Sequence, residues 1–395
     1  MKLSLSVLLL GVTAALGKKC KSEDQLVRKE WRALSIPERD SYLAAVTCLF
    51  TKPSKLLGRK TNFVPQNRYE DFVALHIWAT TPGNPADPSN FFLSGPGIHF
   101  NGVFLPWHRY LLWTYEAALR DECSYSGAQP YWDWTLDTVS HGGASFASSP
   151  IFSPTHGFGG NGVDGTTPFP LDQFDFFGAP WGSCVADGPF ASPPTPLRNL
   201  GYGYNLTTAH PHCVKRNFQV TTFSGVDSCL SWPGMVYPLL TTAAGDFANF
   251  TSSMGTGPGA LDTRFDPNCP LGIHGGGHFG VGGEMVNTWS STNDPLFFMH
   301  HAQLDRIWAL WQSLDSRNLF AIGGPVYPNG TGGTVGLDYT VEMLDKHAFD
   351  KDAPVGDVMD PRNSNGKGIL CYRYEEDGQP VPPAPVARRE QEWSA

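Results

Sequence analysis

The chain has 395 residues, of which 41% are hydrophobic and 13% aromatic, so it holds enough apolar material for one large core or two smaller ones. Its formal net charge is −9, and it has no basic stripe that would neutralise the phosphates of a nucleic acid. Composition and charge therefore argue against a disordered chain and a nucleic-acid partner, and they favour a globular protein whose substrate is neutral or recognised by a local site.

The first 17 residues have the pattern of a secretory signal peptide. Lys2 precedes an apolar run over residues 3–16, and Ala15-Leu16-Gly17 places small residues at the usual cleavage spacing. The run is too short to span a bilayer, and no later segment has the roughly 18 uninterrupted apolar residues of a membrane helix. A buried N-terminal helix is the alternative. We expect a secreted, extracellular protein with no membrane partner.

Sequons and cysteines agree with secretion. Asn205, Asn249 and Asn329 each begin an Asn-x-Thr glycosylation sequon. The eight cysteines are an even number, so disulfides are expected in an oxidising compartment, although their pairing cannot be derived from the sequence. Because no Cys-x-x-Cys pair occurs, a structural zinc knuckle is not expected.

Three segments in the first third of the chain have the pattern of long helices. Ser35-Ile36-Pro37-Glu38 is a capping box with an early proline, and apolar residues follow at helical spacing through Leu49. A second helix is predicted over residues 68–79, because Pro82 prevents its continuation. A third begins with FLPWHRYLLWTYEAALRDEC, residues 104–123, where Pro106 suits a first helical turn.

The rest of the chain contains one more long helix and a long segment without strong periodicity. Residues 141–270 are rich in Gly, Pro, Ser and Thr, and we expect a loop-dominated insertion packed on a helical core. The stretch NDPLFFMHHAQLDRIWALWQSLDS, residues 293–316, predicts a helix with Asp294 as N-cap and Pro295 behind it. Residues 376–395 are proline-rich and charged, and a disordered tail is expected there.

Two of these helices share an internal similarity. Phe104 precedes His108 by four residues, and Phe297 precedes His301 by four. The similarity indicates two related helix-borne sites that face each other, with a chance match between aromatic-rich helices as the alternative.

Six of the twelve histidines form two groups of three, one in each half of the chain. The groups are His76, His99 and His108, and His274, His278 and His301. Residues four apart share one helix face, so the imidazoles of an i, i+4 pair can bind one metal ion. Any one of these histidines alone would more often be a core residue, whereas two groups of three favour metal sites.

The stretch IHGGGHF, residues 273–279, contains the i, i+4 pair and is open to several interpretations. A zinc protease would need His-Glu-x-x-His, but Gly275 follows His274. An oxyanion-hole loop would need a G-x-S-x-G elbow, and GASFA at residues 143–147 departs from that motif. A ligand set made only of imidazoles suits copper, and two such sites close together suit dioxygen. The predicted cofactor is therefore a pair of copper ions.

Four stretches of the chain resemble the tyrosinase and polyphenol oxidase family, most closely its short secreted fungal members, which carry a binuclear type 3 copper centre. They are DFVALHIW, HFNGVFLPWHRYLLWTYEAALRDEC, QPYWDW and NDPLFFMHHAQLDRIWALW. The resemblance implies a mainly α-helical fold in which a four-helix bundle holds the dicopper site, with long loop-rich insertions and few short strands. It further implies one catalytic domain over residues 18–375.

The resemblance also implies a ligand set and a reaction. His76, His99 and His108 would hold the first copper, and His274, His278 and the second histidine of the pair His300-His301 would hold the second. The partners would be O2 and a small phenol. We expect oxidation of o-diphenols to o-quinones, with methoxyphenols and monophenols as further candidate substrates. The oligomeric state stays open.

Four more residues are candidates for roles around the copper ions. Phe297 matches the position that in relatives leans over the second copper and restricts the incoming ring, although an aromatic residue is equally typical of a helix core. Asp305, one turn after His301, is expected either to orient an imidazole or to form a helix-surface pair with Arg306 or a neighbour.

Gly275 and Phe279 follow two ligands of the second copper, where many relatives have an asparagine and several a polar or smaller residue. A general base contributes roughly 10²–10⁴-fold to a rate, so without a positioned base we expect o-diphenols to be better substrates than tyrosine-like monophenols.

Further departures and alternatives bear on function. Gly97-Ile98 precede His99, so the Cys-His thioether of several fungal relatives is not expected. A C-terminal lid domain is not expected beyond the motif Tyr372-Arg373-Tyr374. The alternative functions are a tailoring oxidase of a pathway-specific phenol or peptide tyrosine and, less favoured, an oxygen carrier of the hemocyanin kind.

Overall fold

The computed structural model describes most of the chain between the two ends. The described residues are 20–59, 63–80, 97–138, 146–164, 181–201, 206–219, 229–257 and 272–375. The expected signal peptide, the expected tail and Asn205 lie outside them.

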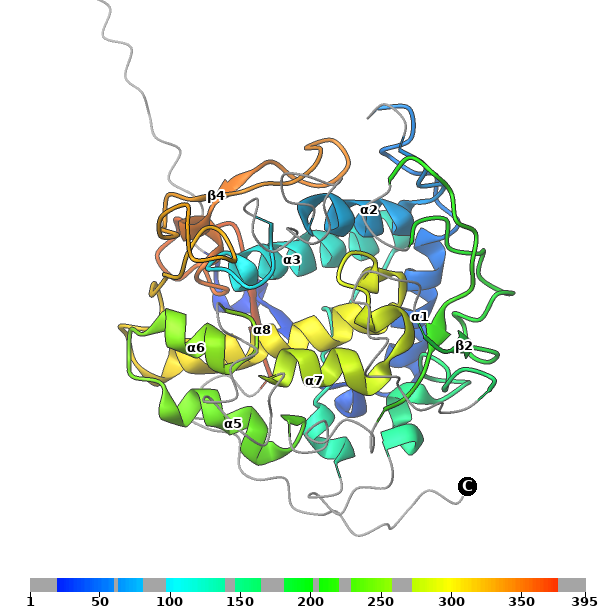
Figure 1. Ribbon diagram of the computed structural model, residues 1–395, viewed down its shortest axis with the longest axis horizontal. Coiled ribbons are helices and arrows are strands. Elements are labelled where there is room, and N and C mark those ends of the chain that lie inside the picture. The colour runs from blue at the N-terminus through cyan, green and yellow to red at the C-terminus, as the bar shows by residue number, and fades with distance from the viewer. Residues whose placement is uncertain are drawn as a thin grey trace, which may run out of the picture.

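Seven α-helices make up the main framework of the described residues. Helices α3 and α8 pack against each other through the middle of the molecule, α1 packs on α3, and α5 and α7 pack on α8 (Figure 1). The helices are α1 (Ile36–Leu49), α2 (Arg68–Thr80), α3 (Phe104–Cys123), α5 (Trp232–Thr241), α6 (Phe247–Ser253), α7 (Gly272–Val281) and α8 (Leu296–Leu314). The mainly helical fold predicted from the sequence is confirmed.

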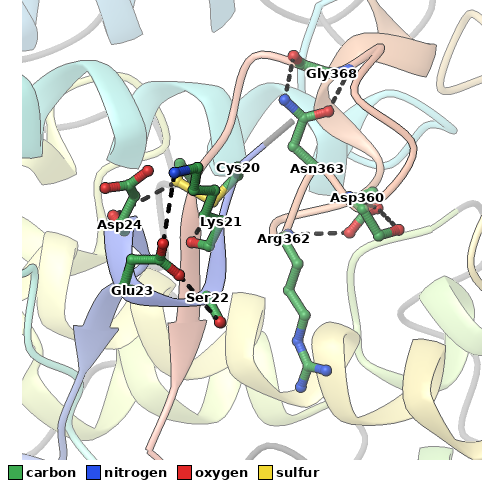
Figure 2. The surroundings of a disulfide bond; sticks show 11 residues. Cys20, Lys21, Ser22, Glu23, Asp24, Asp360, Arg362, Asn363 and Gly368 are labelled. Atoms are coloured by element: carbon green, nitrogen blue, oxygen red, sulfur yellow. Dashed lines mark hydrogen bonds and ion pairs between the residues drawn. A yellow bond between two sulfur atoms is a disulfide. The ribbon is translucent and has the colours of Figure 1, made fainter. Parts of the chain in front are cut away.

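The strands are short and form three two-stranded sheets. Strand β1 (Leu26–Arg28) pairs in parallel with β6 (Tyr372–Tyr374), which brings the two ends of the described chain together beside the Cys20–Cys371 disulfide (Figure 2). The other two sheets are antiparallel: β2 (Ser183–Cys184) pairs with β3 (Lys215–Arg216), and β4 (Thr340–Val341) pairs with β5 (Ala353–Pro354).

The predicted helix starts agree with the structure to within two residues. At α1 the Glu38 carboxylate accepts the N–H of Ser35 at 2.7 Å, which is the back-bond of the capping box. At α8 the Asp294 carboxylate accepts the N–H of Leu296 at 3.1 Å, and the buried Arg216 guanidinium donates to that carboxylate at 2.7 Å. Local start signals therefore fix the beginnings of α1 and of the histidine-bearing helix α8.

The prediction of a loop-dominated insertion over residues 141–270 needs correction, because α5 and α6 lie within it. The Ser231 side chain caps α5, and the Asp246 side chain caps α6. The two helices have only 10 and 7 residues, and Pro238 interrupts the pattern of α5. Because the two helices are short, few residues carry their apolar periodicity. The capping residues were the remaining sequence signal of a helix start.

Disulfides are present, as expected from the cysteine count. Cys48–Cys123 joins the end of α1 to the end of α3, and Cys184–Cys213 ties β2 to the segment before β3. Cys229 is disulfide-bonded as well. Among the described residues, no helix is both long enough and apolar enough to cross a membrane.

Candidate metal centre

The structure brings the six predicted histidines together as two buried triads. Within each triad the candidate donor atoms lie within 4.8 Å of one another. Helix α2 supplies His76, α3 supplies His108 and the segment before α3 supplies His99, while α7 and α8 supply the second triad. The rings of His108 and His301 stack at 4.5 Å between centroids, so the triads face each other. The sequence prediction of two facing sites is confirmed.

Backbone carbonyls fix the ring nitrogen that carries the proton in four of these histidines. A carbonyl oxygen only accepts hydrogen bonds, so Nδ1 is the protonated nitrogen and Nε2 keeps its lone pair. The bonds join His76 to the Trp289 carbonyl (2.6 Å), His108 to Phe104 (2.8 Å), His274 to Gly255 (3.2 Å) and His278 to Met285 (2.6 Å).

In three of these four histidines the opposite ring nitrogen lacks a protein partner. Nε2 of His76, His108 and His274 is buried without a hydrogen bond. Buried polar atoms in folded proteins are normally satisfied, and a metal ion would satisfy these lone pairs. The donor set consists only of imidazoles, which suits copper.

The structure also distinguishes between the adjacent histidines 300 and 301. His300 accepts the indole N–H of Trp134 at Nδ1 (3.2 Å) and donates from Nε2 to the His274 carbonyl (3.0 Å). Both of its ring nitrogens are therefore occupied. His301 Nε2 lies 3.2 Å from His278 Nε2, and its Nδ1 has no hydrogen bond, which places His301 in the second triad.

Burial keeps the imidazoles neutral. Desolvation lowers the pKa of His76 to about 3 and that of His278 to about 4. Desolvation, followed by the neighbouring imidazoles, lowers the pKa of His99, His108 and His301 well below the ordinary value. Neutral imidazole is the form that binds a metal ion, so the site is ready for metal at neutral pH.

Close packing explains two of the three central glycines of α7. A β-carbon on Gly276 would lie 2.8 Å from Cβ of Cys229, and one on Gly277 would overlap the ring of His300. Glycine at these positions lets α7 approach its neighbours, although each glycine disfavours a helix by roughly 1 kcal/mol relative to alanine. The glycine-rich stretch is thus a closely packed helix and not a turn. Gly275 lines a pocket beside it.

The two phenylalanines of the internal similarity each contact both triads. The Phe104 ring lies 4.3 Å from that of His108 and 4.7 Å from that of His274. The Phe297 ring, which is fully buried, stacks at 4.0 Å on His301 and lies 5.0 Å from His76. Each of the two rings therefore packs against a histidine of both triads.

A pocket opens beside the second triad. Its described lining residues include no acidic, lysine or arginine side chain. They are His99, Phe100, Gly255, His274, Gly275, His278, Phe279, Met285, Val286, Asn287, Thr288 and Ser291. Gly275 and Phe279 are thus in the lining, whereas Phe297 lies outside it.

The expected contact between Asp305 and an imidazole is wrong. The Asp305 carboxylate accepts from Arg28 (3.1 Å), Arg109 (2.5 Å) and the hydroxyls of Tyr372 (2.6 Å) and Tyr374 (2.5 Å). Burial by itself would raise the pKa of Asp305, but Arg109 and Arg28 hold it below the ordinary value. Asp305 therefore joins α8 to β1, β6 and α3. The expected pairing of Asp305 with Arg306 is also not seen. Arg306 instead forms an ion pair with Asp133, with 3.5 Å between Nη1 and the carboxylate oxygen.

Comparison with known proteins agrees with this geometry. The family model described as the common central domain of tyrosinase matches residues 66–314. Tyrosinase-like protein phomQ2 of Diaporthe leptostromiformis is 33% identical over 357 residues, which cover 90% of this chain and 74% of that protein. N-acetyl-6-hydroxytryptophan oxidase ivoB of Emericella nidulans is 32% identical over 403 residues, which cover 94% and 99%. A solved structure of a glycine-to-asparagine mutant of polyphenol oxidase from Thermothelomyces thermophila matches with a TM-score of 0.64 and 25% identity, covering 91% of each chain.

Proposed function

Because the chain belongs to the tyrosinase family and is a copper oxidoreductase, we propose that it oxidises uncharged o-diphenols to o-quinones with O2. The observation that carries the proposal is the pair of facing, neutral histidine triads beside a pocket whose described lining has no charged side chain. In the balanced reaction two diphenols each lose two electrons and two protons, and one O2 becomes two waters.

The six histidines of the triads would hold two copper ions. When bound, the pair of ions supplies the exchange of electrons between phenol and O2. The protein's contribution is to keep the imidazoles neutral by burial and to orient four of them through bonds from Nδ1 to backbone carbonyls. We infer that α2, α3, α7 and α8, which carry five of the six histidines, correspond to the four-helix bundle expected from the resemblance.

The pocket supports a preference for neutral aromatic rings. Phe100, Phe279, Met285 and Val286 offer apolar surface, and the described lining has no acidic, lysine or arginine side chain to offset the charges of an amino-acid substrate. Burying an uncompensated charge is unfavourable, so a zwitterion should bind less well than an uncharged catechol. Phe297 would limit how far the ring enters, because its buried ring stacks on His301 and lies beside His76.

Gly275 supports a preference for diphenols over monophenols. It lines the pocket directly after His274 but has no side chain with which to take part in removing the phenol proton. A monophenol depends on that deprotonation more than a catechol does, since a general base contributes roughly 10²–10⁴-fold.

The substrate proposal is tested with matched phenols on copper-loaded protein. We expect kcat/KM to be highest for 4-methylcatechol, lower for 4-methylphenol, which lacks one hydroxyl, and lower for L-DOPA, which adds a zwitterion. Turnover of tyrosine as fast as 4-methylcatechol, without a lag, would overturn both preferences.

A tailoring oxidase is the second candidate, favoured by the relative whose name gives N-acetyl-6-hydroxytryptophan as its substrate. The same triads would serve either function. A kcat/KM for that hydroxyindole at least tenfold above that for 4-methylcatechol would favour the specialised enzyme.

We also propose that the protein is secreted and glycosylated. Disulfides and the apolar N-terminal run support secretion, and Asn249 and Asn329 are exposed. Recovery of the chain from the culture medium, with a mass that falls on deglycosylation, is the expected result.

A further inference from the structure

One short segment, residues 285–289, orients a histidine of each triad. The Met285 carbonyl accepts from Nδ1 of His278, and the Trp289 carbonyl accepts from Nδ1 of His76, each at 2.6 Å. The other two carbonyl-bound histidines use separate acceptors, Phe104 and Gly255. The segment therefore links the second triad to the first, and part of it also lines the pocket.

Asn287 holds this segment in shape. Its side-chain oxygen accepts the backbone N–H of Trp289 at 3.0 Å and that of Ser290 at 2.9 Å. Asn287 is 3% exposed, and its backbone N–H donates to the Glu284 carbonyl at 3.0 Å. The side-chain oxygen thus fixes two successive peptide groups.

The second of these peptide groups contains the carbonyl that orients His76. The Ser290 N–H and the Trp289 C=O belong to one planar trans peptide, so they point in opposite directions. Fixing the N–H toward Asn287 therefore aims the carbonyl away from it, at Nδ1 of His76. The bond in turn leaves the buried Nε2 of His76 directed at the first triad.

We propose that Asn287 is a positioning residue for the first copper site, which acts on His76 through the Trp289–Ser290 peptide. It binds no metal itself. The proposal rests on the proposed copper binding of the triads, and it assigns to a pocket-lining residue of the α7–α8 connection an effect on a ligand carried by α2. Loss of an outer hydrogen-bond partner of a metal-bound histidine typically weakens metal affinity about 10–100-fold.

The test compares three variants by competition for Cu(I) with a chelator of known affinity. Asn287→Leu removes the acceptor at similar size, and Asn287→Asp keeps an acceptor oxygen. Asn318→Leu is the matched control, because the buried Asn318 also accepts a backbone N–H, that of Gly245 at 2.7 Å, but lies beyond the end of α8, seventeen residues after His301. Each site is measured alone, the first in an H301A background and the second in an H99A background.

We expect N287L to weaken the first site about 10–100-fold and the second site by much less, while N287D and N318L stay within about threefold of the unsubstituted background. Unchanged affinity of the first site in N287L would overturn the proposal. Equal losses in N287L and N318L, or in N287L and N287D, would also overturn it, since the effect would then be general destabilisation or would not depend on the acceptor oxygen.

One more variant keeps the proposal testable if N287L folds poorly. Asn287→Ser keeps a shorter acceptor, and we expect an intermediate loss at the first site; wild-type affinity in both N287S and any soluble N287L would contradict the proposal. Failure of the copper binding on which the proposal rests has a different signature, because the unsubstituted chain itself would then bind fewer than two copper ions.

Discussion

Gly277 lies where the ring of His300 packs against α7, and a β-carbon there would overlap that ring. Alanine normally stabilises a helix relative to glycine by about 1 kcal/mol. Here we expect the opposite sign: Gly277→Ala should lower the free energy of unfolding by about 1–3 kcal/mol, because an overpacked core must shift. It should also weaken the second copper site by displacing α7. Chemical denaturation and copper titration measure the two effects.

Gly323 is the matched control for this substitution. A β-carbon added there meets no atom within 4 Å, so Gly323→Ala should leave copper binding unchanged and stability within about 0.5 kcal/mol. A Gly277→Ala protein as stable as the unsubstituted chain would show that the His300 ring moves aside easily.

The adjacent histidines 300 and 301 give a second prediction at this scale. His301→Ala removes a member of the second triad, so the purified protein should retain one copper ion per chain. His300→Gln should retain two, because both ring nitrogens of His300 are occupied by Trp134 and His274. The reverse pattern of copper content would show that the ligand had been assigned to the wrong histidine.

At the scale of elements, sequence predicted the helices that carry strong local signals. The capping box of α1 and the proline-marked start of α3 were sufficient to place those two helices. The distribution of the histidines indicated the two groups of three, and the family resemblance selected His301 over His300. The short helices α5 and α6 were missed because few residues carry their periodicity. The carbonyls that orient the histidines were also missed, since any residue type supplies a carbonyl and only the fold brings it near.

Asp305 shows the same limit for long-range contacts. Its partners Arg28 and Tyr372 lie 277 and 67 residues away, and no local pattern connects them. The structure shows that this carboxylate joins α8 to the β1–β6 strand pair. The stability of this junction therefore depends on contacts between separate elements and not on the sequence of one helix.

Asp305→Asn tests the junction. Removing one partner of a buried ion pair typically costs about 3–5 kcal/mol, because Arg28 and Arg109 keep buried charges with less compensation. Urea denaturation should show a loss of this order. The control is Asp315→Asn at the exposed end of the same helix, where only a small change is expected. Equal effects of the two substitutions would contradict the role given to Asp305.

At the scale of the whole molecule, the buried histidines predict how stability depends on pH. The pKa of His76 is lowered from 6.5 to about 3 and that of His278 from 6.5 to about 4, in both cases by burial. Between these values and 6.5 the unfolded chain binds protons that the folded protein does not. The free energy of unfolding of the metal-free protein should therefore fall as the pH drops below 6.5, by up to about 1.4 kcal/mol per pH unit for each such histidine.

Thermal melts of the metal-free and copper-loaded protein between pH 7 and pH 4 would check this dependence. Copper binds only the neutral imidazoles of the folded state, so the loaded protein should remain more stable throughout and lose metal as it unfolds in acid. A melting temperature of the metal-free protein that does not change over this range would show that these histidines are not held neutral by burial.

The central claim is that one chain holds two copper ions and uses them to oxidise phenols with O2. The most direct test measures copper per chain in the purified protein together with O2 uptake on 4-methylcatechol. We predict two copper ions per chain and one O2 consumed for every two diphenols oxidised. Zinc in place of copper, a single copper ion, or two copper ions without O2 uptake would contradict the account.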